Sequence, residues 1–391
     1  MVLSGGRRSR RSATPIRAVL LALFVASLGG SCQVQANPPS GPGTDPALLG
    51  PPLAWTEVVL PDRARPVTLA TAQDGIVIGG VAPVRPEPRL FRTAGGPLTE
   101  VPVEPHSPYA FVARWLSIAV HDGQVLALGG ARGGAHANVR WTVWRGQLRS
   151  APRLVEQPQP FGVFGGWGAG DLTGVAFAGN EPVIAGAWAS DRAGNDVSLW
   201  RVAGDRWARQ DSTGTPLGSS PDVLNGARFV TSTGDGLALA GSVTDLGGGA
   251  IVSVPALWTA PGADGPWTLV RLPASQRIAE AHAARCDDAG CLVVGADGDS
   301  LAAWEVRGPT VTRLDVPRLV LAEHASVPAP VVIGDRTYVA LPGVLLEGTD
   351  GGWHRRPGPE GVPVAAAATS DGLYLVTTEP QDGSHLWTGR P

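Results

Sequence analysis

Aromatic and charged side chains gather in two long stretches of the chain and in the loops predicted beside them. The stretch 104–115 carries Tyr109 and Trp115, and the glycine-rich stretch 156–171 carries Phe164 and Trp167. Aromatic faces beside charged groups suit the recognition of a glycan or a peptide. The candidate ligand-binding residues are Tyr109, Trp115, Arg132, His136, Phe164, Trp167, Trp188, Asp191, Arg192 and Asp196.

Two other interpretations of these residues stay open. Large aromatic side chains are often buried, and these would then only hold long loops to the body of the protein. Hydrolysis of a glycoside needs two carboxylates flanking the bond, and Asp171, Asp191 and Asp196 lie in this part of the chain. The sequence sets no separation between them. We therefore favour binding without chemistry over a secreted glycan-active hydrolase.

Motifs of other chemistries are missing from the sequence. It contains no G-x-S-x-G elbow, no H-E-x-x-H zinc motif and no phosphate loop. Asp297 and Asp299 stand at a glycine turn, but two carboxylates are too few for calcium, and we expect a solvated turn there. We predict no catalytic residue, no metal site and no cofactor.

Two cysteines, Cys286 and Cys291, flank a short polar turn in the body of the chain. If the turn joins two strands, the cysteines face each other on one hairpin, and an oxidising compartment links them as a disulfide. A zinc site needs about four ligands, and the body has no second cysteine pair. The disulfide is the better interpretation.

Seven copies of one pattern carry these residues. Each copy has an apolar stretch, a tight turn and a second apolar stretch, and the turns are roughly 50 residues apart, the range of propeller blades. Asp-Gly between apolar runs is a strong hairpin signal, because both residues accept the positive φ that the turn requires. The seven turns are Asp74-Gly75, Asp122-Gly123, Gly179-Asn180, Asp235-Gly236, Asp288-Ala289-Gly290, Gly334-Asp335 and Asp371-Gly372.

A third strand, often with a leucine–tryptophan pair such as Leu199-Trp200, and a short outer strand complete each copy. The seventh copy stops after its third strand, while Trp55–Pro61 shares its pattern with the outer strand Trp267–Pro273. We therefore predict an all-β fold over residues 54–391: a seven-bladed β-propeller of four-stranded blades, closed by the N-terminal strand. Closure removes exposed sheet edges, and we expect the tryptophans to fill the space between blades.

The turns between third and outer strands resemble degenerate Asp-boxes, the Ser-x-Asp-x-Gly-x-Thr-Trp hairpins of sialidase-like (BNR-repeat) propellers. The matching segments are Asp264–Trp267, Thr349–Trp353 and Gly204–Trp207. The resemblance implies boxes that are structural and lie away from the binding face. It does not extend to sialidase catalysis, which needs a tyrosine nucleophile paired with a carboxylate and three arginines that grip the substrate. Of Tyr109, Tyr338 and Tyr374, the last two lie inside predicted strands, and the arginines match no such motif. Likeness of fold says little about activity.

The first residues have the features of a bacterial export signal. An arginine-rich start precedes an apolar run over 18–28, which is short for a membrane span. Cys32 directly follows Gly29-Gly30-Ser31, which resembles a lipobox, and lipidation would occur there; Val34–Ala36 is the alternative cleavage site of a secreted protein. We predict a signal peptide at 1–31 and a Pro/Gly-rich tether at 32–53.

The formal net charge is −3, with acids and bases interspersed. A nucleic-acid binder would carry a basic patch, so we predict no nucleic-acid partner. The expected protein is a non-enzymatic binding or scaffold propeller of the cell envelope, whose partner is an envelope glycan or protein. Its N-terminal lipid would hold it at the outer face of the cytoplasmic membrane, and plain secretion is the alternative.

Overall fold

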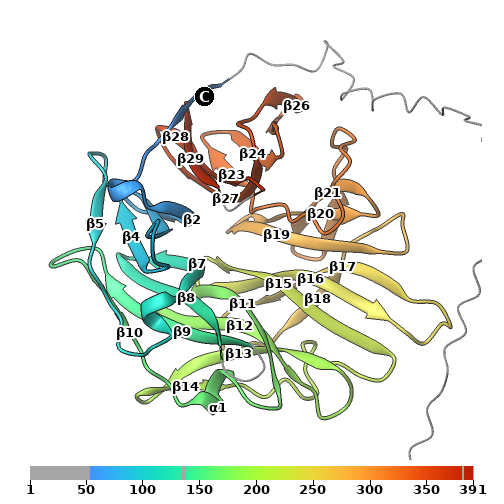
Figure 1. Cartoon of the computed structure of the whole chain (residues 1–391). Coiled ribbons are helices and arrows are strands. Elements are labelled where there is room, and N and C mark those ends of the chain that lie inside the picture. Colours follow the sequence, from blue (N-terminus) through green and yellow to red (C-terminus); the bar gives the residue numbers. More distant parts are fainter. Residues whose placement is uncertain (1–52, 134–137, 381–382, 391) are drawn as a thin grey trace, which may run out of the picture. The chain divides into compact units, whose positions relative to one another are not determined.

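The computed structural model describes residues 53–133, 138–380 and 383–390, and it confirms a seven-bladed β-propeller built of four-stranded antiparallel sheets (Figure 1). The second strand of blade 1, Gly75–Val81, shows why the apolar runs predict this fold, because it is buried along its whole length. A strand between two neighbouring blades has no solvent-facing side, so both of its faces are apolar.

Blades 1 to 3 follow each other along the chain, and each runs from its inner to its outer strand. Blade 1 contains β2 (Arg65–Ala72), β3 (Gly75–Val81), β4 (Pro88–Arg92) and β5 (Thr99–Val101). Blade 2 contains β7 (Arg114–His121), β8 (Gln124–Gly133), β9 (Asn138–Gln147) and β10 (Arg153–Glu156). Blade 3 contains β11 (Ala169–Ala178), β12 (Glu181–Ala189), β13 (Asn195–Ala203) and β14 (Arg206–Arg209).

Blades 4 to 7 repeat this order. Blade 4 contains β15 (Val223–Thr233), β16 (Gly236–Asp245), β17 (Val252–Ala260) and β18 (Thr268–Arg271). Blade 5 contains β19 (Ala279–Asp287), β20 (Gly290–Asp297), β21 (Ser300–Arg307) and β22 (Thr310–Arg313). Blade 6 contains β23 (Val331–Ile333), β24 (Arg336–Leu341), β25 (Val344–Thr349) and β26 (Gly352–Pro357). Blade 7 contains β27 (Val362–Thr369), β28 (Gly372–Thr378), β29 (Ser384–Arg390) and β1 (Ala54–Glu57).

The N-terminal strand closes the ring, as predicted. β1 pairs antiparallel with β29, with Ala54 opposite Arg390 and Glu57 opposite Trp387. The first strand of the propeller is thus the outer strand of its last blade, which covers a sheet edge that would otherwise be open.

Blade 2 differs from the prediction by one strand. β6 (Val103–Glu104) pairs in parallel with β10, so this sheet has five strands. A strand of two residues has no sequence period, so it gives no signal of its own. Helices are short in the described residues: α1 (Phe161–Phe164) and the 3-10 turns η2 (Pro61–Arg63) and η3 (Ala110–Val112).

The tryptophans of the third strands lie in the core between blades. Trp200, Trp258 and Trp304 are fully buried. Each indole N–H donates to a backbone carbonyl of the connection that enters its own blade, at 2.8 Å to Val163, 2.9 Å to Pro216 and 2.8 Å to Pro273. A buried indole needs such a partner. The same tryptophan therefore packs the blade and fixes the loop above it.

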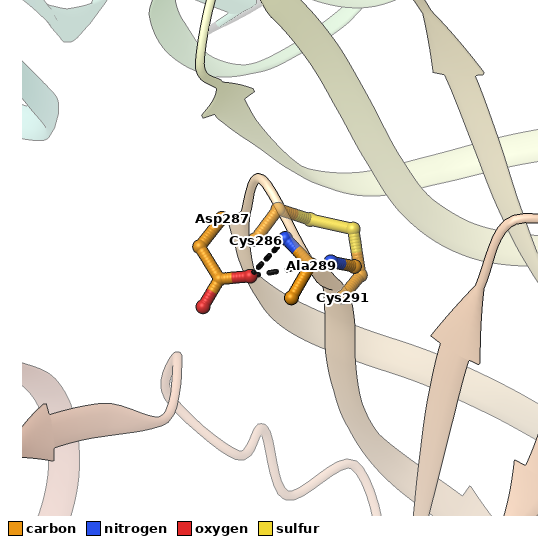
Figure 2. The surroundings of a disulfide bond; sticks show 5 residues. Cys286, Asp287, Ala289 and Cys291 are labelled. Atoms are coloured by element: carbon orange, nitrogen blue, oxygen red, sulfur yellow. Dashed lines mark hydrogen bonds between the residues drawn. A yellow bond between two sulfur atoms is a disulfide. The ribbon is translucent and has the colours of Figure 1, made fainter.

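The disulfide between Cys286 and Cys291 is confirmed. The two residues are opposite each other on β19 and β20, at the end of the hairpin (Figure 2). The Asp287 carboxylate accepts hydrogen bonds from the backbone N–H groups of Ala289, at 2.8 Å, and Gly290, at 3.2 Å. The turn is thus closed by a covalent bond and by its own aspartate.

The strand order gives the propeller two faces of different construction. Each blade is an antiparallel meander, so the loop between its second and third strands lies on the same side as the connection from its outer strand to the next blade. We call this side the connection face. The other side, the hairpin face, holds the turns between first and second strands and between third and outer strands, including the Cys286–Cys291 hairpin.

Candidate ligand-binding site

The connection face carries the exposed apolar surface of the described residues. Every large apolar side chain that is exposed in the described residues lies on a connection, on a second-to-third loop or at the start of an inner strand, which are all parts of the connection face. These residues are Val59, Val84, Phe111, Val112, Leu116, Phe161, Trp167, Leu246, Ile251, Ile278, Val320, Val362 and Val364. Gathered apolar side chains on a surface mark sites of interaction. The connection face is therefore the candidate binding surface.

A cavity of about 310 Å³ lies on this face, between blade 2 and the connection that leads to blade 3. Its volume is at the lower end of the range for small-molecule sites. We call it the blade 2–3 cavity. Its lining includes Tyr109, Arg140, Trp141, Gln159, Phe161 and Phe164.

An arginine close to two aromatic rings is the central feature of the blade 2–3 cavity. The Cζ atom of Arg140, on β9, lies 4.4 Å from the centre of the Phe161 ring and 6.0 Å from the centre of the Tyr109 ring. The electrons of a ring face attract a guanidinium at these distances. Tyr109 is held in turn by close packing, because a Cβ at Gly133 would come within 2.5 Å of its ring.

A buried carboxylate fixes the wall of the cavity that carries Tyr109. Glu156, at the end of β10, is 3% exposed. One of its oxygens accepts hydrogen bonds from the backbone N–H groups of His106 and Ser107, both at 2.6 Å, and the other accepts from the Ser107 hydroxyl, also at 2.6 Å. Hydrogen bonds to a charged acceptor are the strong ones. The connection from blade 1 to blade 2 is therefore held in one conformation.

The opposite wall, which carries Phe161, is held from blade 3. The Phe164 ring packs on the buried Trp200, with ring centres 5.9 Å apart. The side-chain oxygen of Gln159 accepts a hydrogen bond from the Trp207 backbone N–H, at 3.1 Å. Figure 1 shows α1 beside β14, the outer strand of blade 3. Two blades thus position the two rings that enclose Arg140.

Trp167 and Trp188, two predicted ligand residues, lie at different depths beside this wall. Trp167 is fully exposed. Trp188 is half-buried, with its ring edge-on to Trp200 and the Arg209 guanidinium 5.1 Å from its centre. The backbone N–H of Ala189 donates to the Gly168 carbonyl at 2.7 Å, which ties the connection to the loop of blade 3.

Two other predicted residues lie inside the protein. Trp115 is 3% exposed, and its indole N–H donates to the Arg89 carbonyl at 2.8 Å. Asp196 is 5% exposed and accepts a hydrogen bond from the Ser219 backbone N–H at 2.6 Å. These side chains hold the connection face from beneath.

The remaining predicted residues come from the second-to-third loops of blades 2 and 3. Asp191 and Arg192 are exposed on the loop of blade 3, and Arg132 is exposed near the end of β8. Arg192 also lines a polar cavity of about 260 Å³ together with Asp196. His136 and Cys32 lie outside the described residues.

The sequence analysis missed Arg140 and the part played by Glu156. Both residues lie on strands, whereas the predicted ligand residues were sought on the connections and loops. The available signal for Arg140 was its place in β9, four residues before the buried Trp144, where a strand approaches the connection face. Nothing in the sequence pairs Glu156 with the loop at His106, 50 residues earlier.

The expectation of a solvated turn at Asp297 is wrong. Asp297 is 3% exposed and accepts hydrogen bonds from Ser275 and Gln276, at 2.8 to 2.9 Å, together with an ion pair from Arg313. Burial alone would raise the pKa of this carboxyl, but the hydrogen bonds and Arg313 hold it below its ordinary value. Its role parallels that of Glu156, because it fixes the connection into blade 5.

The inner strands of all seven blades enclose a central channel of about 470 Å³. His282, on β19, lines the channel and is 6% exposed. Its Nδ1 accepts a hydrogen bond from the Val327 backbone N–H at 3.2 Å. Burial, with a smaller effect of the nearby Arg228 charge, lowers the pKa of His282 from 6.5 to about 4. This histidine is neutral at pH 7.

Two kinds of feature are absent from the part of the chain that the structure describes. No cluster of three or more His, Cys, Asp or Glu side chains is arranged to hold a metal ion. No helix has the length and apolar character needed to cross a membrane.

Comparisons with known proteins support the fold and identify no family. No protein-family model and no curated protein matches the chain. Virginiamycin B lyase from Staphylococcus aureus superposes with a TM-score of 0.53 at 12% identity, over 87% of this chain and 99% of that one. YCF48, solved with a D1 peptide, gives 0.53 at 11% identity, over 88% and 99%. The polysaccharide lyase Uly1 gives 0.50 at 8% identity, over 87% and 92%.

Identities this low show a shared β-propeller and no more. The resemblance to BNR-repeat propellers stays a prediction. Its three segments do lie at the turns between third and outer strands, on the hairpin face.

Proposed function

We propose that this chain is an exported, non-enzymatic binding propeller of the cell envelope, whose connection face takes a glycan or a peptide. One observation carries the proposal: the exposed large apolar side chains of the described residues gather on the connection face, where the blade 2–3 cavity also lies. Exposed apolar side chains that lie together on one face commonly mark a site where a ligand or partner binds.

The first and last strands of the propeller meet at the hairpin face. Ala54 and Arg390 pair with each other at the hairpin-face ends of β1 and β29. A tether over residues 32–53 would join the propeller at that face.

The buried carboxylates of the connection face favour binding over hydrolysis, and Asp171 and Asp191 are the exposed candidates that the turnover test addresses. A glycosidase needs two carboxyl groups free to act on the bond, about 5 to 10 Å apart. Glu156 and Asp196 are both buried, and both accept hydrogen bonds from the backbone of neighbouring connections. Such carboxylates position loops.

The test is a screen of the purified mature chain against envelope glycans, peptidoglycan fragments and peptides, read for binding and for turnover. We expect binding without turnover, and a loss of binding in Phe161→Ala and Trp167→Ala. Trp353→Ala is the matched control, because this tryptophan is the second residue of β26, at the hairpin face.

Turnover that disappears in Asp191→Ala would overturn the proposal in favour of a hydrolase. If binding survived both Phe161→Ala and Trp167→Ala, or if Trp353→Ala weakened it equally, the result would show that the ligand does not bind at the connection face.

A further inference from the structure

We infer that the ligand of the blade 2–3 cavity is an acidic saccharide whose carboxylate pairs with Arg140. This inference rests on the proposed binding function and names the ligand class. It starts from the geometry of the arginine. The guanidinium carbon lies 4.4 Å from the centre of the Phe161 ring and 6.0 Å from that of Tyr109, and ring contacts of this kind leave the N–H groups of a guanidinium able to donate. A planar fork of donors matches a carboxylate, which accepts two hydrogen bonds from it.

Arg140 has no anionic partner among the described residues. Elsewhere, Arg313 pairs with Asp297, Arg201 with Glu181, and Arg336 with Glu347. Arg140 is half-buried in the blade 2–3 cavity, and its described contacts are to the two aromatic rings. A partly desolvated charge is costly unless it is paired. A ligand anion would supply the missing partner.

The one acidic group that lines the same cavity cannot take this place. Glu156 uses both oxygens to accept hydrogen bonds from His106 and Ser107. Turning its carboxylate toward Arg140 would break all three hydrogen bonds. The cavity therefore presents the positive charge of Arg140. The carboxylate in its lining is already bonded to the wall that carries Tyr109.

The surroundings favour a saccharide over a peptide. An extended peptide commonly adds to a free strand edge, but β10, beside the cavity, is paired on one side with β9 and on the other with β6. The cavity instead offers the 60%-exposed ring of Phe161 and the side chain of Gln157. Sugar rings stack on aromatic faces, and their hydroxyls bond to amides.

The experiment compares matched ligands on matched variants. An array of galacturonate, glucuronate and mannuronate oligosaccharides is printed beside the same oligosaccharides with their carboxyl groups reduced to alcohols. Wild-type protein should bind at least one uronate, and reduction of that ligand should weaken binding about tenfold to a hundredfold, the range for loss of a charge-assisted hydrogen bond.

Variants of Arg140 should bind the acidic and reduced forms alike. Arg140→Ala removes the charge and the ring contacts, and Arg140→Gln keeps an unbranched polar side chain without the charge, in case the alanine variant unfolds. Arg206→Ala removes one positive charge from the hairpin face, at the start of β14, and should leave binding unchanged.

Equal binding of acidic and reduced sugars by wild type would overturn the inference and leave the proposed function standing. Binding of a hexaglutamate peptide in place of every uronate would overturn the assignment to a saccharide. Binding of no sugar in either form and of no peptide would count against the proposed function itself.

Discussion

The indole ring of Trp55 lies over Gly389 where the first and last strands of the propeller meet. The two residues are opposite each other in the pairing of β1 with β29, and a Cβ at position 389 would come within 2.8 Å of the ring. The Trp55 N–H also donates to the Pro357 carbonyl of blade 6, at 3.2 Å. One tryptophan thus joins three strands at the point of closure.

Gly389→Val should weaken closure, because the new side chain collides with Trp55. We expect a loss of about 1 to 3 kcal/mol in the free energy of unfolding, the usual cost of overpacking, measured by urea denaturation. Gly96→Val is the control, since a Cβ there has no atom within 4 Å. Equal stability of the two variants would show that the ring does not depend on this contact.

Removal of the disulfide should lower stability by a modest amount. Cys286 and Cys291 are five residues apart, and a loop this short corresponds to about 2 kcal/mol in the chain-entropy model. The double variant Cys286→Ser/Cys291→Ser should therefore unfold at lower urea than wild type, and reduced wild type should match it. A double variant as stable as the oxidised protein would contradict the prediction.

The stability of the protein should fall between pH 7 and pH 4 because of His282. Its pKa is about 4 in the folded protein and 6.5 as the ordinary value, so the unfolded chain binds more protons in this window and stability falls as the pH falls. The full shift corresponds to about 3 kcal/mol. His282→Asn keeps an acceptor for the Val327 N–H and should give a flatter profile across this window. Parallel profiles would show that other groups cause the loss.

A second loss of stability should begin below the window of His282. Hydrogen bonds and arginines hold the pKa values of Asp297 and Glu347 below their ordinary values of 3.8 and 4.5, although burial alone would raise both. A lowered carboxyl pKa gives stability above the ordinary pKa, and this is lost as the pH falls through the folded value. Asp297→Asn should therefore reduce the pH dependence of unfolding below pH 4 and leave the His282 window intact. If Asp297→Asn left the pH dependence of unfolding below pH 4 unchanged, the prediction would be contradicted.

Much of the fold was predictable because its signals are local. Asp-Gly turns and apolar runs need only neighbouring residues, and the seven turns, the Cys286–Cys291 pairing and the closing strand follow from them. β6 was not predictable, since Val103 and Glu104 pair with β10 only after the connection has folded back. Asp297 was assigned to a turn because its partners, Ser275 and Gln276, come from a different connection.

The candidate site was predictable as a face but not as a cavity. Aromatic residues on long connections indicate the connection face, and Tyr109, Phe164 and Trp167 all lie on it. Burial, however, depends on what packs above each side chain, so Trp115 and exposed Trp167 look alike in the sequence. Arg140 became a candidate ligand residue only in the structure, where two connections place the rings of Tyr109 and Phe161 near its guanidinium.

Glu156→Gln should loosen the wall that carries Tyr109. The amide loses the charge and one acceptor, so the three hydrogen bonds from His106 and Ser107 cannot all persist. We expect a stability loss of about 1 to 3 kcal/mol and weaker ligand binding. Thermal unfolding and calorimetry measure the two effects. If Glu156→Gln destabilised the protein but left ligand binding unchanged, Glu156 would have no part in shaping the binding site.

The most direct test of the central claim is hydrogen exchange of the protein with and without the ligand that the screen identifies. Binding in the blade 2–3 cavity predicts slower exchange of backbone amides in 105–113 and 157–168, which form its two walls, and unchanged exchange in the Cys286–Cys291 turn on the hairpin face. Protection at that turn, with no change in either connection, would contradict the account.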